Sequence, residues 1–233
     1  MIRPIRGYSV QRLLLAAAAL APFAANAEDA PARATGVYVR GAAGIAFADA
    51  LNQDLSYNPA VVFVTPPATS KASDLGEGLA LSGAIGFQYA KTRTELEYRR
   101  MAAPVDGVAY AGGAAPGTPV VNDDLVAQAL MSNVYFDFVN KTSFTPHIGF
   151  GVGGARVENE LGERDAAFAY QGRVGVEVAL GAKFSIGAEY AYFRTLDLVY
   201  GPKEFDPAGA AGPRTDGDPF VSSSVMGTVR VLF

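Results

Sequence analysis

The feature that most constrains this chain is an alternation of apolar and polar residues that returns in eight separate segments. A period of two is typical of β-strands, because successive side chains of a strand point to opposite faces of the sheet. We expect strands near residues 36–48, 79–90, 92–101, 125–138, 144–157, 167–181, 183–194 and 221–233. An even number of strands with two chemically different faces predicts an all-β fold, an up-and-down antiparallel barrel.

The large apolar side chains of these segments share one parity, and examples are Val37, Phe87, Phe150 and Tyr190. About thirty side chains of this size would overfill the interior of an eight-stranded barrel, which side chains only just fill. The apolar face must therefore point outward, and such a barrel belongs in a lipid bilayer.

The opposite parity combines long charged residues with glycines such as Gly149, Gly151 and Gly175. Glycine weakens a strand interior, but in a narrow lumen it leaves room for Arg and Glu. Five positive and five negative side chains balance, so we interpret them as a paired plug and not as a charged channel. The predicted lumen charge network comprises Arg40, Arg93, Glu95, Glu97, Arg99, Asp137, Arg173, Glu177, Glu189 and Arg230.

The connections between the expected strands alternate between long and short without exception. Outer-membrane barrels have short periplasmic turns and longer extracellular loops, and the spacing has this asymmetry. The short connections are near 90–92, 139–143 and 181–183. A soluble barrel, the other reading of eight alternating segments, offers no physical reason for the pattern.

The first 27 residues have the features of a secretory signal peptide. Arg3, Arg6 and Arg12 precede an apolar run over 13–25, and Ala25 and Ala27 form a small-x-small cleavage site. The run is shorter than the ~20 residues that a transmembrane helix needs. We expect cleavage after Ala27, which leaves 28–233 as an exported barrel domain.

Composition excludes several other classes. The chain has no Cys and a formal net charge of −4, which becomes more negative once the Arg-containing leader is removed. A disulfide-rich or cysteine-ligated zinc protein is excluded, and a general attraction to nucleic acid is not expected. We expect no cofactor and no bound metal.

Three patterns resemble catalytic or nucleotide-binding motifs. The glycines at 149–154 match G-x-G-x-x-G, but they lie within a strand and no helix follows. Glu95 and Glu97 form a carboxylate pair on one face, but Arg93 and Arg99 flank them, so we expect ion pairs instead. His147, the only histidine, is expected to face inward near the periplasmic end. We therefore expect no catalytic residue and no enzyme.

Arg100, Arg156 and Arg194 have the outward parity at the loop ends of their strands. This is the depth of lipopolysaccharide phosphates, and we hypothesise charge-assisted contacts with them. The alternative is that the three side chains snorkel into water.

Four segments resemble a known family: 36–44, 145–153, 184–194 and 225–233. They are similar to the small eight-stranded outer-membrane barrels of Gram-negative bacteria, in particular the opacity-type surface antigens and related OmpA-like barrels. The resemblance implies a location in the cell outer membrane and partners among its lipids. It also implies that Val229, Val231 and Phe233 belong to a signal read by the outer-membrane assembly machinery.

For a closed barrel, specific function is expected in the loops. The first expected loop contains the apolar run 60–64, which is either a contact site for an extracellular or host partner or part of an added hairpin. The leading functional hypothesis is a non-enzymatic surface barrel that supports membrane integrity and offers loops for interaction or adhesion. The alternatives are a narrow porin-like channel for ions or small solutes and, third, a lipid-modifying barrel enzyme.

Overall fold

The structure, a computed structural model, describes residues 35–117, 122–201 and 213–233. The expected signal peptide, with Ala25 and Ala27, lies outside these residues. Across them the regular structure is entirely β, and no helix is long and apolar enough to span a membrane. The strands are β1 (Gly36–Ala48), β2 (Leu51–Ser56), β3 (Ser70–Leu75), β4 (Glu77–Tyr89), β5 (Thr92–Ala111), β6 (Asp124–Asp137), β7 (Phe144–Glu158), β8 (Arg164–Ala179), β9 (Phe184–Thr195), β10 (Leu198–Tyr200), β11 (Arg214–Gly217) and β12 (Val221–Leu232).

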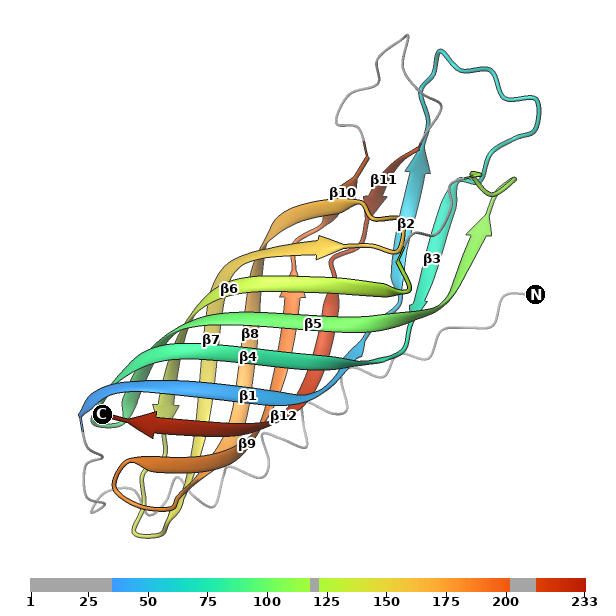
Figure 1. The fold of residues 1–233 in the computed structure, drawn as a ribbon. Helices are drawn as coiled ribbons and strands as arrows, with labels where there is room; N and C mark the ends of the chain where they lie inside the picture. The colour runs from blue at the N-terminus through green and yellow to red at the C-terminus, as the bar shows by residue number, and fades with distance from the viewer. Residues whose placement is uncertain (1–34, 118–121, 202–212) are drawn as a thin grey trace.

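Eight of these strands close into an antiparallel barrel (Figure 1). β1 pairs with β4, each strand from β4 to β9 pairs with the next, and β9 pairs with β12. The last ladder joins β12 to β1, from Tyr38 opposite Leu232 to Ala48 opposite Ser222. Closure leaves no free edge within the membrane, which a spanning sheet requires. The predicted eight-stranded barrel is confirmed.

The two faces of the barrel wall divide as the alternation predicts. Ile45 and Phe150 on the outward parity are 52% and 58% exposed, whereas Arg93 and Glu97 on the inward parity are 1% and 0% exposed. The apolar side chains therefore form the outer surface of the wall, as a lipid-facing barrel needs. The protein is a transmembrane β-barrel.

The loop end differs from the expectation, because it contains further strands. β5 does not end near residue 101 but continues to Ala111, and its upper part pairs with β3. β3 pairs with β2, β2 with β11 and β11 with β10, so a second sheet rises beyond the barrel rim (Figure 1). We call these paired segments the extracellular sheet. The added-hairpin reading of the first loop is confirmed, and the run 60–64 lies between the two hairpin strands, outside any strand.

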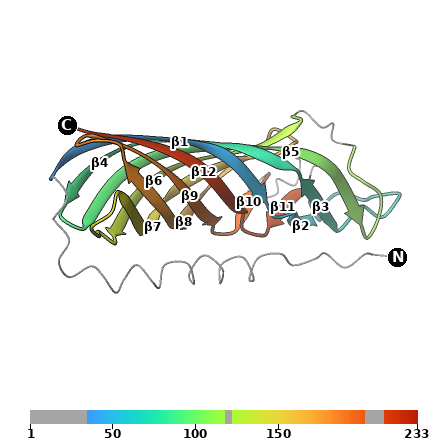
Figure 2. The ribbon, with the colours of Figure 1, turned by 90° about the horizontal axis from the view of Figure 1, so that it is seen from below.

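A buried ion pair fastens the extracellular sheet to the connection between β7 and β8. Lys71 of β3 and Glu160 are 2% and 0% exposed, and Lys71 Nζ lies 2.5 Å from Glu160 Oε1. The Ser73 hydroxyl donates to the same carboxylate oxygen at 3.1 Å. The short turns lie at the other end of the barrel. One end of the molecule therefore has only short connections, and the other end carries the additional strands (Figure 2).

Candidate functional site

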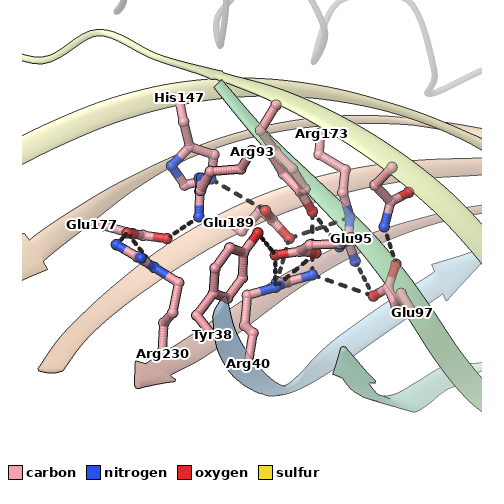
Figure 3. Close-up of polar contacts among 12 residues, drawn as sticks. Tyr38, Arg40, Arg93, Glu95, Glu97, His147, Arg173, Glu177, Glu189 and Arg230 are labelled. Carbon is pink, nitrogen blue, oxygen red and sulfur yellow. Dashed lines mark hydrogen bonds and ion pairs between the residues drawn. The ribbon is translucent and has the colours of Figure 1, made fainter. Parts of the chain in front are cut away.

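The centre of the lumen is occupied by ion pairs that cross it from wall to wall (Figure 3). Arg40 of β1 contacts Glu95 at 3.1 Å, Glu97 at 3.4 Å and Glu189 at 3.3 Å. Arg173 of β8 reaches the same group, at 2.8 Å from Glu97 and 3.3 Å from Glu189. Two guanidinium groups and three carboxylates from four strands thus form one connected cluster.

A second group of ion pairs lies nearer the short turns. Arg93 contacts Glu177 at 2.6 Å and Asp137 at 2.9 Å. Arg230 of β12 lies 2.7 Å from Glu177, and it also donates to Gln88 at 2.7 Å. All ten residues expected in the lumen are at most 5% exposed, so the charged groups are sealed from solvent and lipid.

Uncharged polar side chains complete this network. The Tyr38 hydroxyl donates to Glu95 at 2.9 Å, and the Tyr135 hydroxyl accepts from Arg173 at 2.7 Å. The Asn133 and Gln171 amides donate to Glu97 at 2.9 and 2.8 Å. These four residues were not among those predicted for the lumen, although each has the inward parity that would have identified it.

Glu95 and Glu97 of β5 pair within the lumen, as expected. Arg93 and Arg99 flank them on the same strand face, but the ion-pair partners of the two glutamates are Arg40 and Arg173 across the lumen. Side chains two residues apart on one strand point in parallel, whereas side chains from facing strands meet head-on. Arg99 has no carboxylate within ion-pair distance among the described residues. It donates to Ser224 at 3.0 Å and lies 5.2 Å from the Phe193 ring.

The residues considered for catalysis lie inside this network. His147 is 2% exposed, and its Nε2 is 3.2 Å from Glu189 Oε2. The glycines from Gly149 to Gly154 lie within β7, without the following helix that a nucleotide site needs. Within the described ranges, no group of three or more His, Asp or Glu side chains is placed to hold a metal ion. The residues considered for catalysis thus take part in the buried polar network of the lumen.

Glycines make room for the network, as the sequence analysis proposed. A methyl group at Gly175 would lie 2.8 Å from His147 Nε2, and one at Gly149 would lie 2.5 Å from the Tyr135 ring. Outward glycines such as Gly154 and Gly172 have nothing within 4 Å. The space that a side chain would occupy at each of these inward glycines is therefore filled by a side chain of a neighbouring strand.

Above the charged network lies an apolar layer that the sequence analysis missed. It continues the inward parity toward the loop end, so that Met101 follows Arg99 on β5 and Met131 precedes Asn133 on β6. We define the apolar layer as the buried cluster of Met101, Leu125, Met131, Val157, Phe193 and Phe220. The interior of the barrel thus contains two layers, a charged one and, toward the loop end, an apolar one.

The three arginines assigned to the outer rim keep the expected parity. Arg100 and Arg156 are exposed, and Arg194 is half-buried. At the C-terminus, Val229 and Phe233 are 45% and 69% exposed, and Val231 is half-buried. The terminal residues are held in the wall, since the Phe233 amide donates to the Val37 carbonyl at 2.9 Å.

A closed eight-stranded wall with an apolar exterior and a sealed polar interior defines a class, the small outer-membrane-type barrels. A family model described as "Surface antigen" matches residues 63–215, which is more than half of the chain. The protein therefore belongs to this surface antigen family, and the resemblance seen in the sequence is confirmed.

Solved structures agree on the fold. Neisserial surface protein A is 17% identical, with a TM-score of 0.50 over 85% of this chain and 97% of its own. The outer membrane protein OprG from Pseudomonas aeruginosa is 16% identical, with a TM-score of 0.51 over 85% of this chain and 97% of its own. No curated protein matches the sequence significantly.

Proposed function

We propose that the protein is a non-enzymatic surface barrel of the bacterial outer membrane, exported by a cleaved signal peptide, which presents its loop end to the outside. The observation that carries this proposal is the contrast between the two ends of one closed wall. The turn end has only short connections, and the loop end carries an additional sheet. The barrel then serves as a membrane anchor and the extracellular sheet as the interacting part.

The sealed lumen supports an anchor better than a channel. Its ion pairs are short and buried, and the apolar layer covers them toward the loops. A hydrated ion would have to break several buried pairs and then cross an apolar constriction, and both steps are costly.

The apolar tip of the β2–β3 hairpin supports a role in interaction or adhesion. Val62 and Val64 are 92% and 102% exposed. Two highly exposed valines, separated by Phe63 in the loop of a projecting hairpin, offer apolar contact area to a partner on the outside.

Single-cysteine labelling tests the proposed orientation cleanly, because the chain has no native Cys. With a membrane-impermeant maleimide on intact cells, we expect Val64→Cys to be labelled and Lys141→Cys, in the turn between β6 and β7, to be labelled only after the cells are opened. The reverse pattern would refute the orientation.

A second experiment tests the function of the tip. Cells lacking the gene are complemented with the native chain or with a variant in which residues 60–64 are replaced by Gly and Ser. We expect both chains to restore resistance to detergent and only the native chain to restore attachment to host cells or matrix. Equal attachment by both chains would remove the tip from the proposal.

A further inference from the structure

Two exposed arginines and a glutamine form one row across the lipid-facing side of three neighbouring strands. Arg100 of β5 is opposite Gln128 of β6, and Gln128 is opposite Arg156 of β7. All three residues are exposed on the outer face of the wall. Neighbouring strands are ~4.8 Å apart, so the two arginine Cα atoms lie about 10 Å from each other. We call these residues the arginine row.

The two guanidinium groups of the row have no carboxylate within ion-pair distance among the described residues. The nearest acid along the chain from Arg156 is Glu158, whose carboxylate pairs with Arg164 at 2.7 Å. This contrasts with the lumen, where four of the five arginines form ion pairs. Cations left unpaired near the lipid boundary are placed to bind an anion from outside the protein.

The wall is hollowed beside each arginine. One hollow of about 660 Å³ is lined by Arg156, Gln128, Gly154, Phe168 and Tyr98, and a second of about 510 Å³ is lined by Arg100, Gly83, Gly41, Leu81 and Tyr98. Their floors are open because Gly154, Gly83 and Gly41 have no atom within 4 Å of where a side chain would begin. Tyr98 belongs to both hollows and separates them.

We propose that the arginine row and the two hollows bind a phosphorylated lipid of the outer leaflet, with its phosphates on Arg100 and Arg156 and its acyl chains along the glycine floors. This inference rests on the proposed membrane location and names a partner for the wall, separate from any partner of the loops. Arg194 is not part of the site, because it lines neither hollow and its register partner on β8 is Tyr170, four residues along the strand from Ala166, the partner of Arg156.

The chemistry of the site favours a lipid over free phosphate. A free phosphate would use only the polar upper row, while the hollows below it are apolar and of the size that acyl chains fill. The shared Tyr98 offers an apolar ring between the two chains, and its hydroxyl is able to donate a hydrogen bond to a polar group of the lipid. Each hollow thus combines one cation with one apolar groove, as an anionic lipid requires.

The experiment measures lipid binding to the protein purified from outer membranes in mild detergent, with electrophoretic heat-modifiability as the check of folding. The probes are lipid A with both phosphates, lipid A from which the phosphates have been removed, and inorganic phosphate. For the double variant Arg100→Gln and Arg156→Gln, we expect affinity for phosphorylated lipid A to fall at least about tenfold, since each lost charge-assisted contact is worth this much or more. The dephosphorylated lipid should bind to the native protein as weakly as phosphorylated lipid A binds to the double variant.

Matched variants separate the site from general effects. Gly154→Leu fills one hollow and should weaken the binding of lipid A several-fold, whereas Gly172→Leu, at an equally open outward glycine that lines neither hollow, should leave it unchanged. Arg214→Gln removes a cation of the loop end that is paired with Asp216 and lines neither hollow, and it should also leave the binding of lipid A unchanged.

Unchanged affinity in the double glutamine variant, or an equal loss with Arg214→Gln, would overturn the site. Inorganic phosphate that binds as tightly as lipid A would overturn the lipid assignment. None of these outcomes touches the maleimide pattern of Val64→Cys and Lys141→Cys, so failure of the lipid site and failure of the proposed orientation are distinguishable.

Discussion

Gly149 of β7 faces the ring of Tyr135 on the neighbouring strand so closely that a methyl group at the glycine would lie 2.5 Å from the ring carbon Cδ1. The two residues are register partners inside the lumen, where Tyr135 also accepts a hydrogen bond from Arg173. Because Gly149 has no side chain, the Tyr135 ring fits beside it and the tyrosine hydroxyl can accept the hydrogen bond from Arg173.

Gly149→Ala should destabilise the barrel, because the added methyl group forces Tyr135 away from Arg173. We expect a loss of about 1–3 kcal/mol in the free energy of unfolding, the range typical of overpacked interiors. Urea titration in lipid vesicles measures it. The control, Gly154→Ala in the same strand, points into open space and should change stability little; equal losses in the two variants would contradict the account.

Arg173→Met should be among the most damaging single changes in the wall. It leaves Glu97 and Glu189 buried with one partner fewer, and breaking a buried pair costs about 3–5 kcal/mol. The same urea titration applies. Arg164→Met, which breaks the exposed pair with Glu158, should change the free energy of unfolding far less, because solvent screens an exposed ion pair. A similar small effect at both sites would mean that the lumen is hydrated.

The native protein should show no steady conductance in a planar bilayer, because two different barriers close its lumen. Arg40→Ala removes contacts of the charged network only, so we expect this variant to remain closed beneath the apolar layer. Adding Phe193→Ala and Met131→Ala removes the second barrier and should produce measurable conductance. Steady current through the native chain would revive the porin-like alternative.

Lys71→Met should loosen the extracellular sheet without unfolding the barrel. The substitution leaves the buried Glu160 carboxylate without its lysine, and the β2–β3 hairpin loses its fastening to the connection between β7 and β8. Limited proteolysis should cleave the hairpin at least about tenfold faster, which corresponds to a loss of about 1.4 kcal/mol in the closed state. Arg214→Met, at the exposed pair with Asp216, serves as the control and should be cleaved at the native rate.

The wall of this protein could be predicted from its sequence because a period of two leaves only two choices for each strand. The large apolar side chains are too bulky for the lumen, so they must face outward. All ten charged residues that were therefore expected in the lumen are buried there. Parity gives the direction of a side chain but not its partner, so the pairing of Glu95 and Glu97 within the lumen could be predicted, but not the identity of their partners. Their partners are fixed by barrel closure, which brings Arg40 and Arg173 across the lumen.

The loop end was predictable only in part. Beyond residue 101, β5 reads Ala, Ala, Pro, Val, Asp and Gly, a sequence with little alternation and with turn formers. It is a strand because β3 supplies an edge with which it pairs. The apolar layer was missed for a related reason: Met101 and Phe193 follow the inward parity, but without the charges that marked the lumen below them.

The length of β5 has a mechanical consequence. Its 20 residues at ~3.3 Å each extend about 65 Å, roughly twice the thickness of the hydrocarbon core. One strand therefore connects the short turn after β4 to the projecting sheet, with a register shift in its ladder with β3 between Asp74 and Leu75. A partner that pulls on the hairpin tip loads the β3–β5 ladder along the strand direction, so that its hydrogen bonds resist together and do not open one after another. The hairpin is thus paired with a strand that is itself part of the barrel wall, and this arrangement is suited to bearing tension.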